Sequence, residues 1–139
     1  MKFKIVISII VFIFVVLVYT IVNQKVYKTL VCNGDFALAE GVSSQEYTFE
    51  GVNNYIKTQK LEVILHTTNQ DIMDDYLSIV SKNEECHDII VKEDLLSYIC
   101  DYDLEKNHYY SSIEDNDGRL SFKTVKEKFE EDSFVCYYK

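Results

Sequence analysis

Several features that would point to a particular chemistry are missing from this chain. It has no G-x-S-x-G motif, in which many serine hydrolases carry their nucleophile. It has no N-x-[ST] acceptor for N-glycosylation, which favours a bacterial envelope over a eukaryotic secretory route. Positive charge is also scarce, because 14 Lys and Arg residues stand against 23 Asp and Glu. An acidic chain repels phosphate backbones, so we expect no nucleic-acid partner.

One long apolar run occupies the N-terminal end. Residues 5–22 hold no charged residue, glycine or proline. As an α-helix rising about 1.5 Å per residue, they would reach about 27 Å, close to the ~30 Å hydrocarbon core of a bilayer. We therefore predict a short cytoplasmic N-terminus at residues 1–4, a transmembrane signal anchor in the lipid bilayer at residues 5–22, and one extracytoplasmic domain at residues 23–139.

Two alternatives to a permanent anchor would leave different sequence signals. Signal-peptide cleavage needs small residues just after the apolar run, and residues 20–25 offer no A-x-A-like pair. Lipidation needs a cysteine directly behind the run, whereas Cys32 lies further on, behind Leu30 and Val31. The uncleaved anchor is the preferred interpretation, with cleavage and lipidation as the alternatives.

The four cysteines all lie C-terminal to the apolar run and predict two disulfides. An even number of cysteines in a small domain is typical of an oxidising compartment. A hairpin turn centred on Glu93 would place Cys86 opposite Cys100, within the Cα separation that a disulfide needs. The remaining pair, Cys32 and Cys136, would join the first strand to the last. The disulfides place the domain outside the cytoplasm at the cell membrane.

Hydrophobic periodicity predicts an α+β fold behind the transmembrane helix. Alternating apolar residues between turn signals predict strands, and apolar stripes at helical spacing predict helices. The predicted strands are residues 26–32, 46–50, 55–66, 86–91, 95–103 and 133–138, and the predicted helices are residues 69–82 and 122–132. The order β-ββ-α-ββ-α-β favours one antiparallel β-sheet domain with its helices packed on one face.

Local signals set the predicted ends of these elements. Asn33 and Gly34 are turn formers that end the first strand, and residues 35–45 are expected to form a loop. Capping-box patterns that start at Thr68 and Thr124 are expected at the two helices of the domain.

The sequence offers few candidates for a catalytic or metal site. Cys86 and His87 are neighbours, but adjacent strand residues point to opposite faces and cannot act together. A zinc site that adds Cys100 and His108 competes with a disulfide that uses the same two cysteines. An EF-hand loop starting at Asp101 lacks the required glycine and glutamate, so an irregular calcium site is the only alternative there. We predict no catalytic residue, no metal ligand and no cofactor.

Tyrosine is the one compositional excess, with 11 residues. Tyrosine is over-used at interfaces because one end of its ring is apolar and the other forms hydrogen bonds. Two pairs that flank polar stretches form a candidate interaction surface, namely Tyr109, Tyr110, Tyr137 and Tyr138. The alternative is that a core without tryptophan uses tyrosine as filler.

Residues 46–103 combine two hairpins with a helix between them. The first hairpin begins YTFEGVNNYIK, the helix reads DIMDDYLSIV and the second hairpin ends ICDYD, with TLVC before this segment and FVC after it. This layout resembles the YehR-like lipoproteins and related small anchored proteins of low-GC Gram-positive bacteria. The resemblance implies an extracytoplasmic α+β domain without an established activity.

The preferred functional hypothesis is a single-pass membrane protein without a catalytic centre. Its disulfide-braced domain would act by binding an unidentified protein or other envelope partner. The alternative is an envelope enzyme or metal-dependent protein whose site is built from dispersed Asp, Glu and His residues.

Overall fold

The computed structural model describes residues 2–139, with side chains described from Ile7 onward. The strands in this part are β1 (Tyr27–Leu38), β2 (Gly41–Val52), β3 (Tyr55–Thr67), β4 (Cys86–Val91), β5 (Leu95–Asp103), β6 (Leu120–Ser121) and β7 (Val135–Tyr138). The helices are α1 (Lys2–Val22), α2 (Gln70–Val80) and α3 (Phe122–Glu131). Within these residues the strands form one antiparallel sheet in the order β4-β5-β3-β2-β1-β7, with β6 paired to β3. The predicted α+β fold is confirmed.

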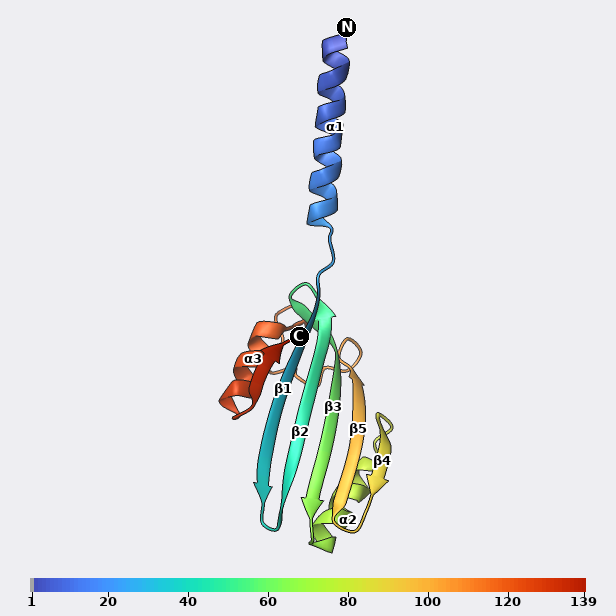
Figure 1. The fold of residues 1–139 in the computed structure, drawn as a ribbon, viewed down its shortest axis with the longest axis vertical. Coiled ribbons are helices and arrows are strands. Elements are labelled where there is room, and N and C mark those ends of the chain that lie inside the picture. Colours follow the sequence, from blue (N-terminus) through green and yellow to red (C-terminus); the bar gives the residue numbers. More distant parts are fainter. Residues whose placement is uncertain (1) are drawn as a thin grey trace.

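Helix α1 stands apart from the sheet and is joined to it by a short linker (Figure 1). Its large apolar side chains between residues 7 and 22 are 43% to 75% exposed. Among the side chains that are described, no helix is both long enough and apolar enough to cross a membrane. The predicted span at residues 5–22 begins before Ile7, the first residue whose side chain is described. The transmembrane helix therefore stays a prediction.

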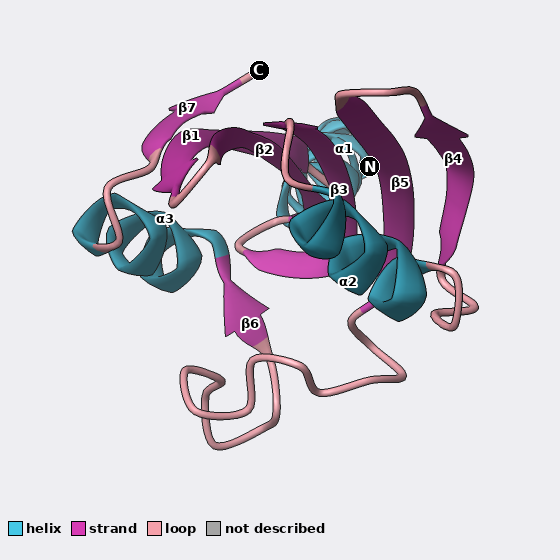
Figure 2. Cartoon of the chain, turned by 90° about the horizontal axis from the view of Figure 1, so that it is seen from below, coloured by secondary structure: helices cyan, strands magenta, loops and turns pink. Residues whose placement is uncertain are grey.

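Helices α2 and α3 lie on the same face of the sheet (Figure 2). Alternate strand residues point to this covered face, and Phe49, Leu65 and Leu96 are fully buried there. Helix α3 packs on the β1 and β2 side of the sheet, and α2 packs on the β3 and β5 side. The prediction that the helices of the domain cover one face is confirmed.

Strands β1 and β2 form an additional hairpin, at the place where the sequence predicts a short strand followed by a loop. Strand β1 continues through Asn33 and Gly34 to Leu38, and β2 begins at Gly41, so the prediction of a loop at residues 35–45 is wrong. Gly34 does not form a turn. It allows the Phe134 ring to pack closely against β1, because a Cβ atom at this position would lie 2.8 Å from that ring. A glycine at a close approach can therefore interrupt a strand pattern without ending the strand.

The second hairpin keeps its predicted cysteine pair despite a different turn. Val91 lies opposite Leu96, one residue further along β5 than a turn centred on Glu93 would give. The register shifts back through a bulge at Asp88, whose φ is 52°. The extra residue in the bulge offsets the longer turn, so Cys86 still faces Cys100.

The two helices of the domain are capped by residues other than those predicted. The side chain of Asn69 accepts hydrogen bonds from the backbone N–H groups of Asp71 and Ile72, at 3.0 and 3.3 Å. Ser121 caps α3 in the same manner by accepting from the Thr124 N–H group at 3.1 Å. The predicted capping boxes at Thr68 and Thr124 are wrong, because competing cap residues lie one and three positions away.

Replacing Asn69 by alanine is expected to lower the free energy of unfolding by about 1 kcal/mol, because two N–H groups of α2 lose their acceptor. Thr68→Ala is the matched control, since Thr68 is exposed and the cap does not depend on it. Its expected effect is within about 0.5 kcal/mol. Urea denaturation followed by circular dichroism measures both variants. An equal loss in the two would contradict Asn69 as the cap.

Candidate functional site

Both predicted disulfides are present and brace the domain at two places. Cys32 and Cys136 are joined with their Cα atoms 4.1 Å apart, and Cys86 and Cys100 with theirs 3.9 Å apart. The described residues contain no free cysteine. The first bridge fixes β7 to β1, close to the end of the domain that leads to α1 (Figure 1). No thiol is left to act as a nucleophile or zinc ligand.

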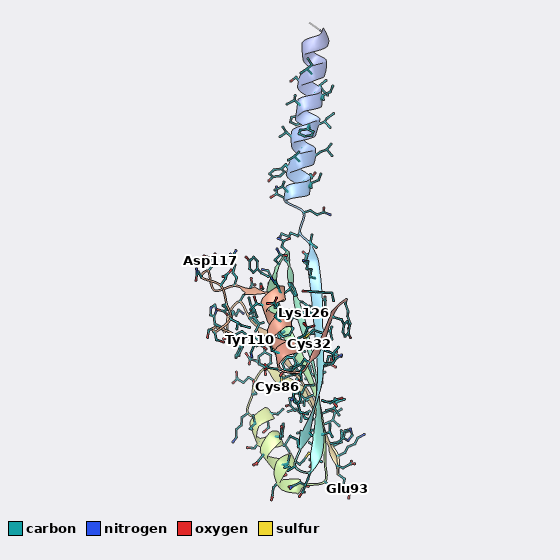
Figure 3. All side chains as sticks on the ribbon, turned by 90° about the vertical axis from the view of Figure 1, so that its left-hand side faces the viewer. Cys32, Cys86, Glu93, Tyr110, Asp117 and Lys126 are labelled. Atoms are coloured by element: carbon teal, nitrogen blue, oxygen red, sulfur yellow. A yellow bond between two sulfur atoms is a disulfide. The ribbon has the colours of Figure 1, made fainter. Side chains whose placement is uncertain are left out.

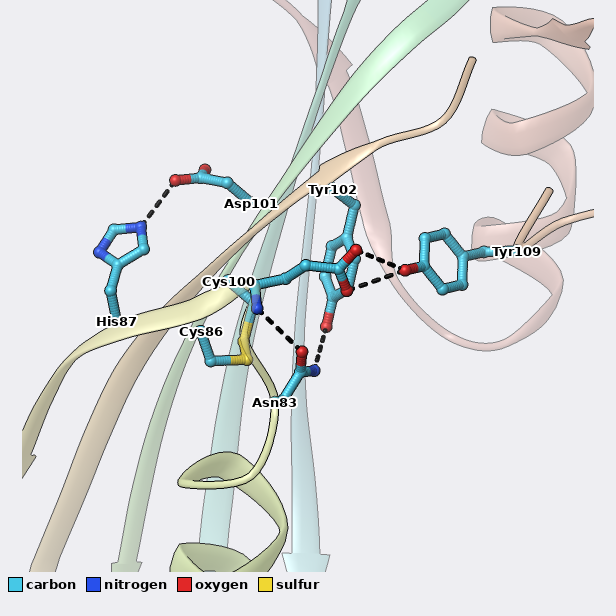
Figure 4. Close-up of a disulfide and its surroundings, with 8 residues drawn as sticks. Asn83, Cys86, His87, Cys100, Asp101, Tyr102 and Tyr109 are labelled. Carbon is cyan, nitrogen blue, oxygen red and sulfur yellow. Dashed lines mark hydrogen bonds and ion pairs between the residues drawn. A yellow bond between two sulfur atoms is a disulfide. The ribbon is translucent and has the colours of Figure 1, made fainter. Parts of the chain in front are cut away.

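His87 points away from the neighbouring disulfide and toward the carboxylate of Asp101 (Figure 4). Its Nε2 atom lies 2.7 Å from Asp101, and its Nδ1 atom lies 3.0 Å from Asp88. The hydrogen bond to Asp101, followed by that to Asp88, raises the pKa of His87. His108 contacts Glu114 instead, at 2.9 Å. Among the described residues, no group of three or more His, Cys, Asp and Glu side chains is placed to hold a metal ion.

The contacts of His87 predict a pH-dependent contribution to stability. Because the folded pKa is raised, protonated His87 stabilises the fold below its ordinary value of 6.5, and this contribution is lost as the pH rises through the folded pKa. We expect Asp101→Asn to lower the His87 pKa in an NMR titration of the imidazole. When urea denaturation is repeated over a range of pH, the His87→Gln variant should not show the fall in unfolding free energy that accompanies deprotonation of His87. A profile that His87→Gln leaves unchanged would contradict the prediction.

The four tyrosines of the predicted interaction surface do not form one surface. Tyr109 donates from its hydroxyl to both oxygens of Glu85, at 2.6 and 2.8 Å, and its ring contacts Tyr102 edge to face (Figure 4). The hydrogen bond to Glu85 raises the pKa of Tyr109 to about 12. Tyr109 therefore ties the loop after β5 to the start of β4.

The other three predicted tyrosines lie elsewhere. Tyr110 is mostly buried: its ring packs beside Phe49 in the core, and its hydroxyl donates a hydrogen bond to Gln59. Tyr137 and Tyr138 are 43% and 51% exposed on the edge strand β7 and point to opposite faces of the sheet. Tyr110 therefore fits the alternative that tyrosine fills the core, while Tyr137 and Tyr138 remain accessible on β7.

A different surface stands out in the folded chain, namely the face of the sheet opposite α2 and α3 (Figure 2). Alternation along the strands turns mostly polar side chains to this side, together with the exposed Val42 and Ile64, and the helices do not cover them. The surface is defined by Asp35, Glu46, Glu50, Lys60, Glu62, Asp101 and Asp103, and we call it the acidic sheet face. Its carboxylates outnumber its single lysine.

Like charges are placed directly opposite each other on the acidic sheet face. Glu46 on β2 pairs with Glu62 on β3, and such a cross-strand pair destabilises a sheet. Lys60 contacts Glu62, and this hydrogen bond raises the pKa of the lysine. Glu46 forms no ion pair among the described residues, although the Lys60 charge attracts it at longer range. The arrangement leaves excess negative charge available to an outside group.

Two shallow depressions interrupt the acidic sheet face. One has a volume of about 440 Å³ and includes Glu50, Lys60 and Asp101 in its lining. The other has a volume of about 490 Å³ and includes Asn33 and Glu46. The Asn33 Oδ1 atom is buried and finds no hydrogen-bond donor among the described residues. The carboxylate oxygens of both depressions match lysine and arginine side chains.

Sequence reasoning missed this surface because it depends on strand register. Residues 46–50 alternate, and Asp101 and Asp103 lie two residues apart, so the polar side of each strand was visible. Only the register β5-β3-β2-β1 brings those polar sides together on one face.

No family model, curated protein or solved structure matches the chain. The resemblance to the YehR-like lipoproteins therefore stays a prediction. Among the described residues, the acidic sheet face is the strongest candidate for a functional site.

Proposed function

We propose that this chain is a single-pass membrane protein whose disulfide-braced domain binds a positively charged partner at the bacterial cell envelope. The observation that carries the binding role is the uncovered acidic sheet face, with Glu46 and Glu62 paired against electrostatic preference. Two disulfides support an oxidising compartment. The exposed apolar side chains of α1 support contact with lipid, and the resemblance to YehR-like lipoproteins agrees with this location.

The shape of the domain suits binding beside a membrane. The strands lie along the long axis of the domain, and Glu93 lies at the end far from α1 (Figure 3). The acidic sheet face therefore extends along the length of the domain rather than lying at its tip. With α1 in a bilayer, a partner could approach this face from the side, clear of the lipid headgroups.

The location is tested by thiol labelling on intact cells. A membrane-impermeant maleimide should label Cys86 and Cys136, the partly exposed partner in each bridge, only after treatment with an impermeant reductant. Non-reducing mass spectrometry of the untreated protein should recover the Cys32–Cys136 and Cys86–Cys100 pairs. Labelling that requires permeabilised cells, or free thiols in the untreated protein, would contradict the proposed location.

The binding role is tested with oligolysine as the probe and the full-length protein in detergent micelles. Glu46→Gln with Glu62→Gln should weaken binding by about threefold to tenfold, because two charges of the face are lost. Binding to the unaltered protein should fall as salt rises. Asp74→Asn with Asp75→Asn is the matched control, since these exposed residues lie on α2, on the other side of the sheet. An equal loss in both double variants would reject the acidic sheet face as the site.

A further inference from the structure

The outer edge of β1 is only partly covered by β7. The two strands pair from Leu30 to Asn33, whereas β1 continues to Leu38. Lys139 N donates to Thr29 O at 3.0 Å, so the backbone of Thr29 faces β7. Because successive strand residues alternate, the backbone groups of Asp35 and Ala37 face the same edge.

These two residues lie beyond the start of β7. In Figure 1, β7 runs beside the upper part of β1 and leaves the lower part without a neighbour on that side. Both residues are exposed, and neither has a strand partner at this edge among the described residues. Two backbone donors and two acceptors at this edge thus have no strand partner among the described residues.

The opposite edge of the sheet is protected by a bulge, whereas this edge carries only the charge of Asp35. Strand β4 carries a bulge at Asp88, a device that disrupts pairing with another chain. Residues 34–38 of β1 have neither a bulge nor a proline or lysine that would block an incoming strand. This segment keeps regular pairing with β2 throughout.

The two sides of the open edge differ in chemistry. The side chain of Asp35 belongs to the acidic sheet face, beside the depression that contains Asn33. The side chain of Phe36 points to the covered face, where its ring centroid lies 5.1 Å from that of Phe134. Leu38 packs against the cluster beneath α2. An added strand would meet a carboxylate on one side and apolar rings on the other.

We propose that the β1 edge at residues 34–38 binds an extended peptide segment in which basic and apolar residues alternate. Main-chain hydrogen bonds to Asp35 and Ala37 add the peptide as a further strand, a known mode of peptide recognition. A basic side chain opposite Asp35 lies on the acidic sheet face, and its apolar neighbour packs near Phe36. This inference rests on the proposed function, since it specifies how the positively charged partner binds. A second copy of this chain fits less well, because edge-to-edge pairing would set two acidic sheet faces side by side.

The test uses a fluorescent peptide that alternates lysine and valine, with the full-length protein in detergent micelles. Ala37→Pro removes one edge N–H group and blocks close approach, so binding should weaken about tenfold. Ala37→Ser is the matched control, because it keeps the N–H group at an exposed position, and it should bind like the unaltered protein. A peptide alternating glutamate and valine should not bind.

Hydrogen exchange measured by NMR tests the contact without relying on a variant. Adding the lysine–valine peptide to the unaltered protein should slow exchange at the Asp35 and Ala37 amides. Slowed exchange along β4 instead, or full binding by Ala37→Pro, would overturn strand addition at β1. So would concentration-dependent protection of Asp35 and Ala37 without peptide, which would identify a second copy as the occupant.

The outcomes separate this inference from the proposed function. Binding that survives Ala37→Pro and is lost in the Glu46→Gln and Glu62→Gln double variant would refute strand addition and leave the acidic sheet face as a binding site. Oligolysine binding that is insensitive to Glu46 and Glu62, together with a lysine–valine peptide that does not bind, would contradict both proposals.

Discussion

Replacing Cys32 and Cys136 together by alanine is expected to lower the free energy of unfolding by about 4.7 kcal/mol, because the bridge closes a sequence separation of 104 residues. The disulfide limits the unfolded chain far more than a local bridge does. It also fixes a four-residue edge strand, β7, whose pairing with β1 is short. Urea denaturation of the full-length protein in detergent, followed by near-UV and far-UV circular dichroism, measures the loss of stability.

The second disulfide provides the control for this expectation. Cys86 and Cys100 are separated by only 14 residues, and replacing both by alanine should cost about 3 kcal/mol. Both double variants remove a cross-strand pair of the same chemistry, so their difference reports mainly on loop length. A Cys86 and Cys100 variant that is less stable than the Cys32 and Cys136 variant would contradict the assigned role of the long bridge.

Phe49→Ala is expected to lower the free energy of unfolding by about 3 to 5 kcal/mol, since it leaves a cavity in the covered core. Phe49 is fully buried, and its ring centroid lies 5.2 Å from Phe129 and 6.2 Å from both Tyr47 and Tyr110. These rings come from β2, α3 and the loop after β5. One substitution therefore loosens three parts of the chain, and urea denaturation should show it as a lower midpoint.

Tyr138→Ala is the matched control for Phe49→Ala. It also removes an aromatic ring, but Tyr138 is 51% exposed and its centroid lies 6.3 Å from its neighbour Phe122. Its expected cost is below about 1.5 kcal/mol, the upper range for an aromatic pair. Similar losses in the two variants would show that the core is not centred on Phe49.

Much of the fold could be predicted because its strands follow a simple alternation. Apolar side chains alternate along β3 and β5, and this alternation predicts the two strands. The helical spacing of Met73 and Val80 predicts α2. The predictions were wrong for residues whose role depends on a contact with a residue far away in the sequence. Gly34 looks like a turn residue until Phe134 is placed against it. The two-residue β6 has too little sequence to show a period.

The candidate site could be predicted only in part, for a similar reason. The cysteine pairs followed from hairpin register and elimination, and both are present. The acidic sheet face needed the relative register of four strands, which no single strand encodes. Tyr110 packs against the core cluster, and composition does not distinguish a ring that binds a partner from one that fills a core.

The Cys32–Cys136 bridge also determines how mechanical load would travel through the molecule. A pull between α1 and the C-terminus enters β1 and passes directly across the sulfur–sulfur bond to β7. The long β2–β3 hairpin, α2 and the β4–β5 hairpin lie between these two cysteines in sequence, inside the covalent ring. Tension on the two chain ends therefore leaves most of the sheet unstretched, and the domain keeps its shape under a strain that would unzip an unbridged sheet.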